Sequence, residues 1–109
     1  MRSLVGAAGV VMLLVGCRQP CYQLCEVRAD AFGECLEPWY LSWTAFEVDS
    51  RDEYVEVCRA ATDAERTHLS RVARSELDEA CETVIDAHES AADCDAQWEV
   101  FEESVDLVP

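Results

Sequence analysis

The seventy residues between Pro38 and Pro109 include neither glycine nor proline. Strands and hairpins need such residues at their turns, because glycine adopts positive φ angles and proline fixes φ. The chain has 109 residues, a length typical of one small domain. We therefore expect a single all-α domain.

A first helix is predicted over roughly residues 20–36. Pro20 suits the first helical position, where its missing N–H would have no partner in any case. Gly33 weakens the helical pattern, and Pro38 ends it. One face of this helix is apolar, with Cys21, Leu24, Cys25, Phe32, Cys35 and Leu36 at helical spacing.

Two capping signatures mark the helices that follow. Ser50 and Glu53 form a capping box, in which each side chain satisfies a free backbone donor, and a second helix is predicted over roughly 51–61. Thr62 and Glu65 repeat the signature, so a third helix is expected to open there. Its apolar stripe consists of Leu69, Ala73, Leu77, Ala80, Cys81, Val84 and His88.

A fourth helix is predicted to start within residues 90–93. Its apolar side consists of Cys94, Trp98, Phe101 and Val105. These segments predict a small bundle of three to four helices. Six cysteines fall on the apolar faces, as a bundle with internal disulfides requires, namely Cys21, Cys25, Cys35, Cys58, Cys81 and Cys94.

The first sixteen residues are predicted to be a targeting segment. After one positive charge, residues 4–15 are an unbroken run of apolar and small residues, shorter than the ~20 that a membrane-spanning helix needs. The run ends in Leu14-Val15-Gly16-Cys17, which resembles the lipobox of bacterial lipoproteins. By this resemblance the chain is cut before Cys17, whose sulfur carries diacylglycerol and whose new amino group is acylated, with chains such as palmitate. An ordinary secretory signal is the alternative.

These assignments divide the chain into a removed signal peptide (1–16), a lipidated cysteine with a very short tether (17–20) and one cysteine-rich α-helical domain (21–109). The three residues before Cys21 reach only ~10 Å when extended, so the domain is expected close to the lipid surface. The resemblance implies a lipid-anchored protein of the bacterial cell envelope, on the outer membrane or cell surface. Beyond the lipobox, the chain resembles small cysteine-rich lipoproteins of unassigned function.

Lipidation of Cys17 leaves an even set of six cysteines. In an exported chain of this size such a set predicts three disulfides, each stabilising the fold by roughly 2 to 4 kcal/mol. Many pairings are possible. A bridge between Cys81 and Cys94, across the turn between the last two helices, is the pairing that we single out.

Metal-binding or redox chemistry is the alternative use of cysteine and histidine. Cys21 and Cys25 are separated by three residues, whereas thioredoxin-type motifs and zinc knuckles have two. His68 and His88 do not lie in a His-Glu-x-x-His arrangement, and His88 falls on an apolar stripe. Beyond residue 17 only Gly33 remains for a phosphate-binding loop. We expect no metal, no cofactor and no catalytic site.

The chain is strongly acidic, with 23 Asp and Glu against 8 basic residues and a net charge of −15, which argues against nucleic-acid binding. Residues 75–109 hold twelve acids and no arginine. Among them Asp78, Glu82 and Asp86 stand four apart on one helix face. A solvated face is one interpretation. Presentation of this half to a basic envelope protein or to divalent cations is the other.

Residues 37–47 concentrate aromatic side chains. Trp39, Trp43 and Phe46 share a face if a short helix starts at Pro38, and Tyr40 lies beside them. Such rings suit a stacking platform for a glycan or peptide, or a foot in the lipid interface. The alternative is that they close one end of the core. Together these features predict a lipid-anchored protein with a structural or binding role.

Overall fold

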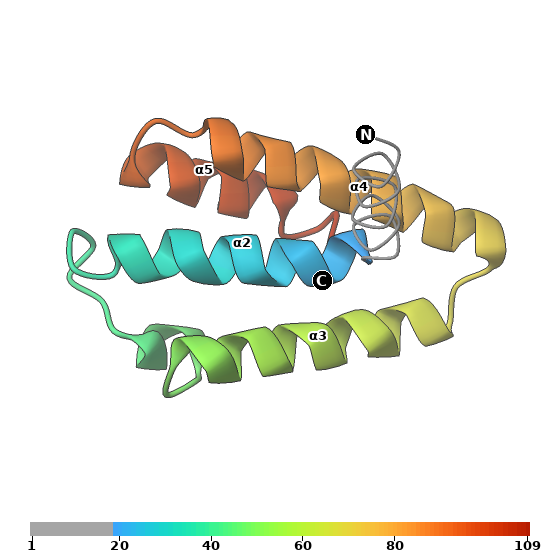
Figure 1. Ribbon diagram of the computed structural model, residues 1–109, viewed down its shortest axis with the longest axis horizontal. Helices are drawn as coiled ribbons and strands as arrows, with labels where there is room; N and C mark the ends of the chain where they lie inside the picture. Colours follow the sequence, from blue (N-terminus) through green and yellow to red (C-terminus); the bar gives the residue numbers. More distant parts are fainter. Residues whose placement is uncertain (1–18) are drawn as a thin grey trace, which may run out of the picture.

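The computed structural model describes residues 19–109, so the signal peptide, the lipobox and Cys17 lie outside the described residues. The described chain consists of α-helices and one short 3₁₀ helix, without strands, which confirms the all-α prediction. The elements are α2 (Pro20–Cys35), η1 (Trp43–Phe46), α3 (Arg51–Thr67), α4 (Arg71–Ser90) and α5 (Cys94–Ser104). Figure 1 shows α2 in the middle of the bundle, with α3 on one side and α4 and α5 on the other.

The ends of α2 and the start of α5 agree with the sequence prediction. The Gln19 side chain accepts a hydrogen bond from the Tyr22 N–H, and Pro20 occupies the first turn. At the start of α5, the Asp93 carboxylate accepts from the Ala96 N–H at 2.9 Å. These caps satisfy backbone donors that have no partner within the helix.

The predicted boundary between the second and third helices, at Thr62, is wrong. Thr62 is buried inside α3, and its hydroxyl donates to the Cys58 carbonyl one turn earlier, at 3.0 Å. A hydroxyl used in this way does not cap a new helix. The break comes after Thr67 instead, and Ser70 caps α4 by accepting from the Ala73 N–H at 3.1 Å.

The short helix from Pro38, which was the condition for a shared face of Trp39, Trp43 and Phe46, does not form. Residues 36–40 form a turn, and Tyr40 adopts a left-handed conformation with φ of 57°. Only Trp43–Phe46 is helical, as the 3₁₀ turn η1. Because the left-handed residue changes the chain direction, Trp39 and Trp43 do not continue along one helix face.

Three disulfides join α2 to each of the other α-helices. They connect Cys21 to Cys81 in α4, Cys25 to Cys58 in α3, and Cys35 to Cys94 at the start of α5. All six cysteines therefore form disulfides, as predicted.

The expected bridge between Cys81 and Cys94 is wrong, because the two residues lie too far apart along the axis of α4. Cys81 lies nine residues before the end of α4 at Ser90, a distance of about 14 Å along the helix axis. Cys94 follows directly after the turn, as the first residue of α5. Disulfides need Cα atoms within about 7 Å, a condition that partners on the neighbouring helix α2 meet instead.

The interior holds a cluster of buried side chains and a group of packed aromatic rings. One lies between α2 and α4 and includes Leu24, Leu77 and Val84. The other surrounds Phe32, which is fully buried and whose ring contacts those of Trp39, Phe46, Tyr54 and Phe101. Among residues 19–109, no helix has both the length and the apolar character needed to cross a membrane.

Candidate functional site

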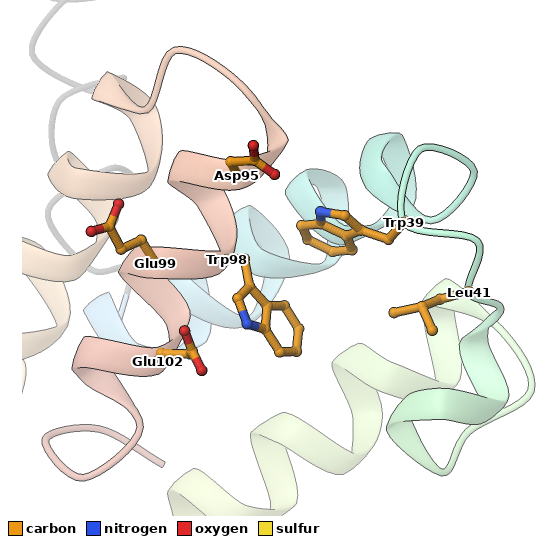
Figure 2. Close-up of a pocket in the computed structure, with 6 residues that line it drawn as sticks. All are labelled: Trp39, Leu41, Asp95, Trp98, Glu99 and Glu102. Atoms are coloured by element: carbon orange, nitrogen blue, oxygen red, sulfur yellow. The ribbon is translucent and has the colours of Figure 1, made fainter.

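A pocket of about 390 Å³ opens between the loop after α2 and one face of α5 (Figure 2). We call it the acidic-aromatic pocket, and its lining consists of Trp39, Leu41, Asp95, Trp98, Glu99 and Glu102. Trp39 and Leu41 come from the loop, and the other four come from α5. Aromatic and acidic side chains thus dominate the lining.

The α5 residues reach the pocket because of their spacing. Positions 95, 98, 99 and 102 are separated by three or four residues, which places them on one side of an α-helix. The disulfide between Cys35 and Cys94 holds the start of α5 at the end of α2. Since Trp39 follows that end by four residues, this bridge brings Trp98 opposite Trp39.

The two indole rings pack edge to face. Their centroids are 5.4 Å apart and their planes are inclined at 73°. Each indole also contacts a ring of the Phe32 cluster: Trp39 lies 6.0 Å from Phe32, and Trp98 lies 5.5 Å from Phe101. These contacts hold the indoles in place before any ligand arrives, which lowers the entropic cost of binding.

The carboxylates of the pocket have no basic partner among residues 19–109. Every ion pair between described residues uses an arginine of α3, namely Arg51, Arg59 or Arg66. Asp95, Glu99 and Glu102 are exposed. In Figure 2, Asp95 and Glu102 stand on either side of Trp98 along α5, while the Glu99 carboxylate is directed away from Trp39.

This arrangement suits a cationic side chain with an apolar stem. A lysine or arginine can lay its methylene groups on Trp39 and Trp98, and its charge gains from both the indole faces and the carboxylates. The acidic and aromatic lining of the pocket is thus complementary to a cation.

The aromatic residues predicted from the sequence divide between two roles. Trp39 lines the pocket, whereas Trp43 is half-buried and packs against Tyr54 and Phe46. Tyr40 is 95% exposed. Trp43 and Phe46 thus pack against other rings of the fold, as the core-closing interpretation expects, whereas a stacking role for Trp39 and Tyr40 stays a prediction.

The three predicted acids of α4 also divide. Asp78 is half-buried, accepts a hydrogen bond from the Gln19 amide at 2.9 Å and pairs with Arg66. Glu82 and Asp86 are exposed, and neither lines the acidic-aromatic pocket. Asp78 thus holds α2, α3 and α4 together, a use that its spacing in the sequence does not reveal.

Sequence reasoning did not single out the α5 residues of the pocket. A signal existed, because Asp95 and Glu102 flank Trp98 at helical spacing on a helix without any basic residue. The sequence did not show that Trp39 lies opposite this face of α5. Residues 19–109 contain no group of three or more His, Cys, Asp or Glu placed to hold a metal ion.

No protein-family model matches this chain, and comparison with curated proteins and with solved structures gives no match either.

Proposed function

We propose that this protein is a lipid-anchored protein of the bacterial cell envelope that binds a basic partner protein through the acidic-aromatic pocket. The lipobox ending at Cys17 supports the anchor. The observation that carries the binding role is the meeting of two pre-positioned indoles with carboxylates that have no basic partner among the described residues.

The pocket suits one basic side chain at a time. A cation over an aromatic face gains about 0.5 to 2 kcal/mol, depending on how far it is desolvated. A stable complex therefore needs further basic residues on the partner, which the other exposed acids of α4 and α5 attract. Charge attraction of this kind raises the association rate and weakens as salt is added.

The position of the pocket relative to the tether supports a partner above the membrane. Gln19 lies at one end of α2, and Trp39 follows the other end. The sixteen residues of α2 span about 24 Å. An anchor at Cys17 holds the Gln19 end near the lipid, so the indoles point into the periplasmic or external space. This orientation favours a partner protein over an aromatic foot in the bilayer.

The metal-binding and redox alternative finds less support. All six cysteines of the described domain are in disulfides, so none offers a thiolate. His88 is buried, and its ring faces Gln97 rather than another ligand.

The test measures binding of a lysine- and arginine-rich peptide to the mature protein, with tryptophan fluorescence as the signal. The double variant Asp95→Asn/Glu102→Gln is expected to lose at least tenfold in affinity, and Trp98→Leu is expected to lose affinity at unchanged net charge. The matched control is Glu82→Gln/Asp86→Asn, which removes the same two charges from the exposed face of α4. It is expected to weaken binding less than threefold.

Equal losses in the two double variants would mean that bulk charge alone attracts the peptide, and the pocket would then have no special role. Full affinity in Trp98→Leu would exclude the indoles from recognition. Binding that does not weaken between low and physiological salt would contradict the charge-based mechanism.

A further inference from the structure

The turn between α3 and α4 is basic in an otherwise acidic chain. Residues 66–74, which we call the basic corner, hold three arginines and one histidine but no acid, whereas the whole chain has 23 Asp and Glu. Two of these arginines, Arg71 and Arg74, are exposed and form no ion pair with another residue among residues 19–109. Val72 lies between them in the sequence and is 70% exposed. The corner thus presents two positive charges and an apolar side chain to the surroundings.

The basic corner projects past the end of α2 at which the tether arrives. Cys21, the second residue of α2, is bonded to Cys81, the eleventh residue of α4. Both helices run in the same direction (Figure 1). The ten residues of α4 before Cys81 therefore extend about 15 Å beyond the level of this disulfide. In Figure 1 the turn between α3 and α4 accordingly reaches beyond the start of α2.

A series of polar contacts links the tether end to the basic corner. The Gln19 side-chain amide donates to the Asp78 carboxylate at 2.9 Å, and the same carboxylate pairs with Arg66. The Arg74 Nε–H in turn donates to the Arg66 carbonyl oxygen at 2.9 Å. These contacts and the disulfide of Cys21 hold the corner in a fixed position relative to Gln19.

The short tether brings the basic corner to the lipid surface. On the anchor proposed above, the three residues between Cys17 and Cys21 reach only ~10 Å. That reach is smaller than the ~15 Å by which α4 extends past Cys21. A bundle that stands on its tether therefore places the corner at the level of the lipid headgroups.

We propose that the basic corner docks on the anionic phospholipid surface beside the anchor. The Arg71 and Arg74 guanidinium groups bind lipid phosphates, which match arginine in charge and geometry. Val72 packs at the boundary between headgroups and acyl chains. The inference rests on the proposed anchor and adds a second membrane contact to it, one that fixes the orientation of the domain.

Charge complementarity favours this docking only for an anchored protein. Glu65 and Glu76 flank the corner in the sequence, so its local positive charge is small. The anchor compensates, because it keeps the corner at a high effective concentration beside the lipid. The acids of α5 lie in the opposite part of the bundle (Figure 1), and charges more than about 8 Å from the surface are screened at physiological salt.

The test couples the mature chain through the Cys17 thiol to a maleimide-bearing lipid in vesicles of phosphatidylcholine and phosphatidylglycerol. This coupling supplies the tether chemically, so the result does not depend on lipidation in the cell. Val72→Trp places a reporter in the basic corner, and Tyr40→Trp places one at an exposed position beyond the other end of α2. Bromine atoms on the acyl chains quench nearby tryptophans. After subtraction of the signal of the unmodified protein, we expect at least threefold more quenching in Val72→Trp than in Tyr40→Trp.

A charge variant and a matched control identify the groups that dock. Addition of Arg71→Gln/Arg74→Gln to Val72→Trp is expected to reduce the quenching at least threefold. The control Ala45→Glu/Ala60→Glu, in the same background, makes the net charge more negative by the same amount at exposed positions in η1 and in α3. It is expected to keep most of the quenching. Vesicles of phosphatidylcholine alone should quench Val72→Trp less than the anionic vesicles do.

Equal quenching of the two reporters would overturn the proposal, because the domain would then have no fixed orientation on the membrane. Quenching that persists in the arginine variant, or that the control loses to the same extent, would exclude docking through Arg71 and Arg74. The proposed anchor is tested separately, by membrane fractionation of Cys17→Ser.

Discussion

At the scale of single residues, His88 shows how burial changes a titratable group. Its Nδ1 lies 2.7 Å from the Gln97 Oε1, and because an amide oxygen only accepts, Nδ1 carries the proton. The Gln97 amide nitrogen in turn donates to the His88 carbonyl oxygen. Nε2 is buried without a partner. Burial lowers the pKa of His88, the nearby Arg28 charge lowers it further, and the hydrogen bond to Gln97 opposes this change.

This depressed pKa predicts that the fold loses stability in mild acid. Below about pH 6.5 the unfolded chain binds a proton at His88 that the folded protein does not bind. Stability should therefore fall as the pH drops from 6.5 towards the lower pKa of the folded state. We expect the free energy of unfolding, measured by urea denaturation, to fall between pH 7.5 and 5.5, with a smaller fall in His88→Gln.

The exposed histidine provides the control for this measurement. His68→Gln changes an exposed side chain at the end of α3. The free energy of unfolding of this variant should fall as the pH is lowered, as it does in the unmodified protein. An identical slope in the His88→Gln protein would show that His88 does not cause the acid sensitivity.

At the scale of elements, α2 is the helix on which the others depend. It packs against α3, α4 and α5 (Figure 1). A disulfide also joins it to each of them. The helices α4 and α5 also pack against each other, whereas α3 packs mainly on α2 and η1. The bridge between Cys25 and Cys58 is thus the covalent link for a helix that packs mainly on one other α-helix.

Removing that bridge should loosen α3 before the rest of the bundle. For a separation of 33 residues, loop closure predicts that Cys25→Ala/Cys58→Ala lowers the free energy of unfolding by roughly 3 to 4 kcal/mol. Amide hydrogen exchange should speed up in α3 while α2 and α4 stay protected. The variant Cys35→Ala/Cys94→Ala is the comparison, because there α3 keeps its bridge and its protection. Uniform loss of protection in both proteins would mean that the bundle opens only as one unit.

At the scale of the whole molecule, unpaired negative charge concentrates in the C-terminal half. The arginines of α3 pair with acids of α2, α3 and α4, which leaves the acids of α5 without an ion-pair partner among the described residues. The same half carries twelve acids and no arginine. On the lipid anchor that we propose, a membrane with anionic lipids would repel this half, and α5 would then lie away from the bilayer.

The anchor itself is a prediction of the sequence. Each buried methylene contributes ~0.8 kcal/mol, so two or three acyl chains should hold the mature protein on membranes in high salt and release it in detergent. The variant Cys17→Ser should be neither lipidated nor retained. Fractionation and intact mass measure both properties. A serine variant that is processed normally and remains with the membranes would contradict the lipobox assignment.

The sequence by itself determined the helical class, the three disulfides and the starts of α2, α3 and α5. These properties depend on residues within a few positions of one another, such as Ser50 with Glu53, or on the number of cysteines. The prediction of a helix boundary at Thr62 was wrong because the Thr62 hydroxyl donates to a carbonyl within α3. The Thr62 side chain also lies beside the Cys25 sulfur of α2.

Only the tertiary structure decided which distant residues meet. Cys81 pairs with Cys21 rather than Cys94 because α2 lies beside α4 at that level of the bundle. Asp78 pairs with Arg66, whereas Asp95 and Glu102 have no basic partner among residues 19–109 and lie beside an indole pair that joins the loop after α2 to α5. Helical spacing places a residue on a face, but the packing of the helices determines what that face contacts.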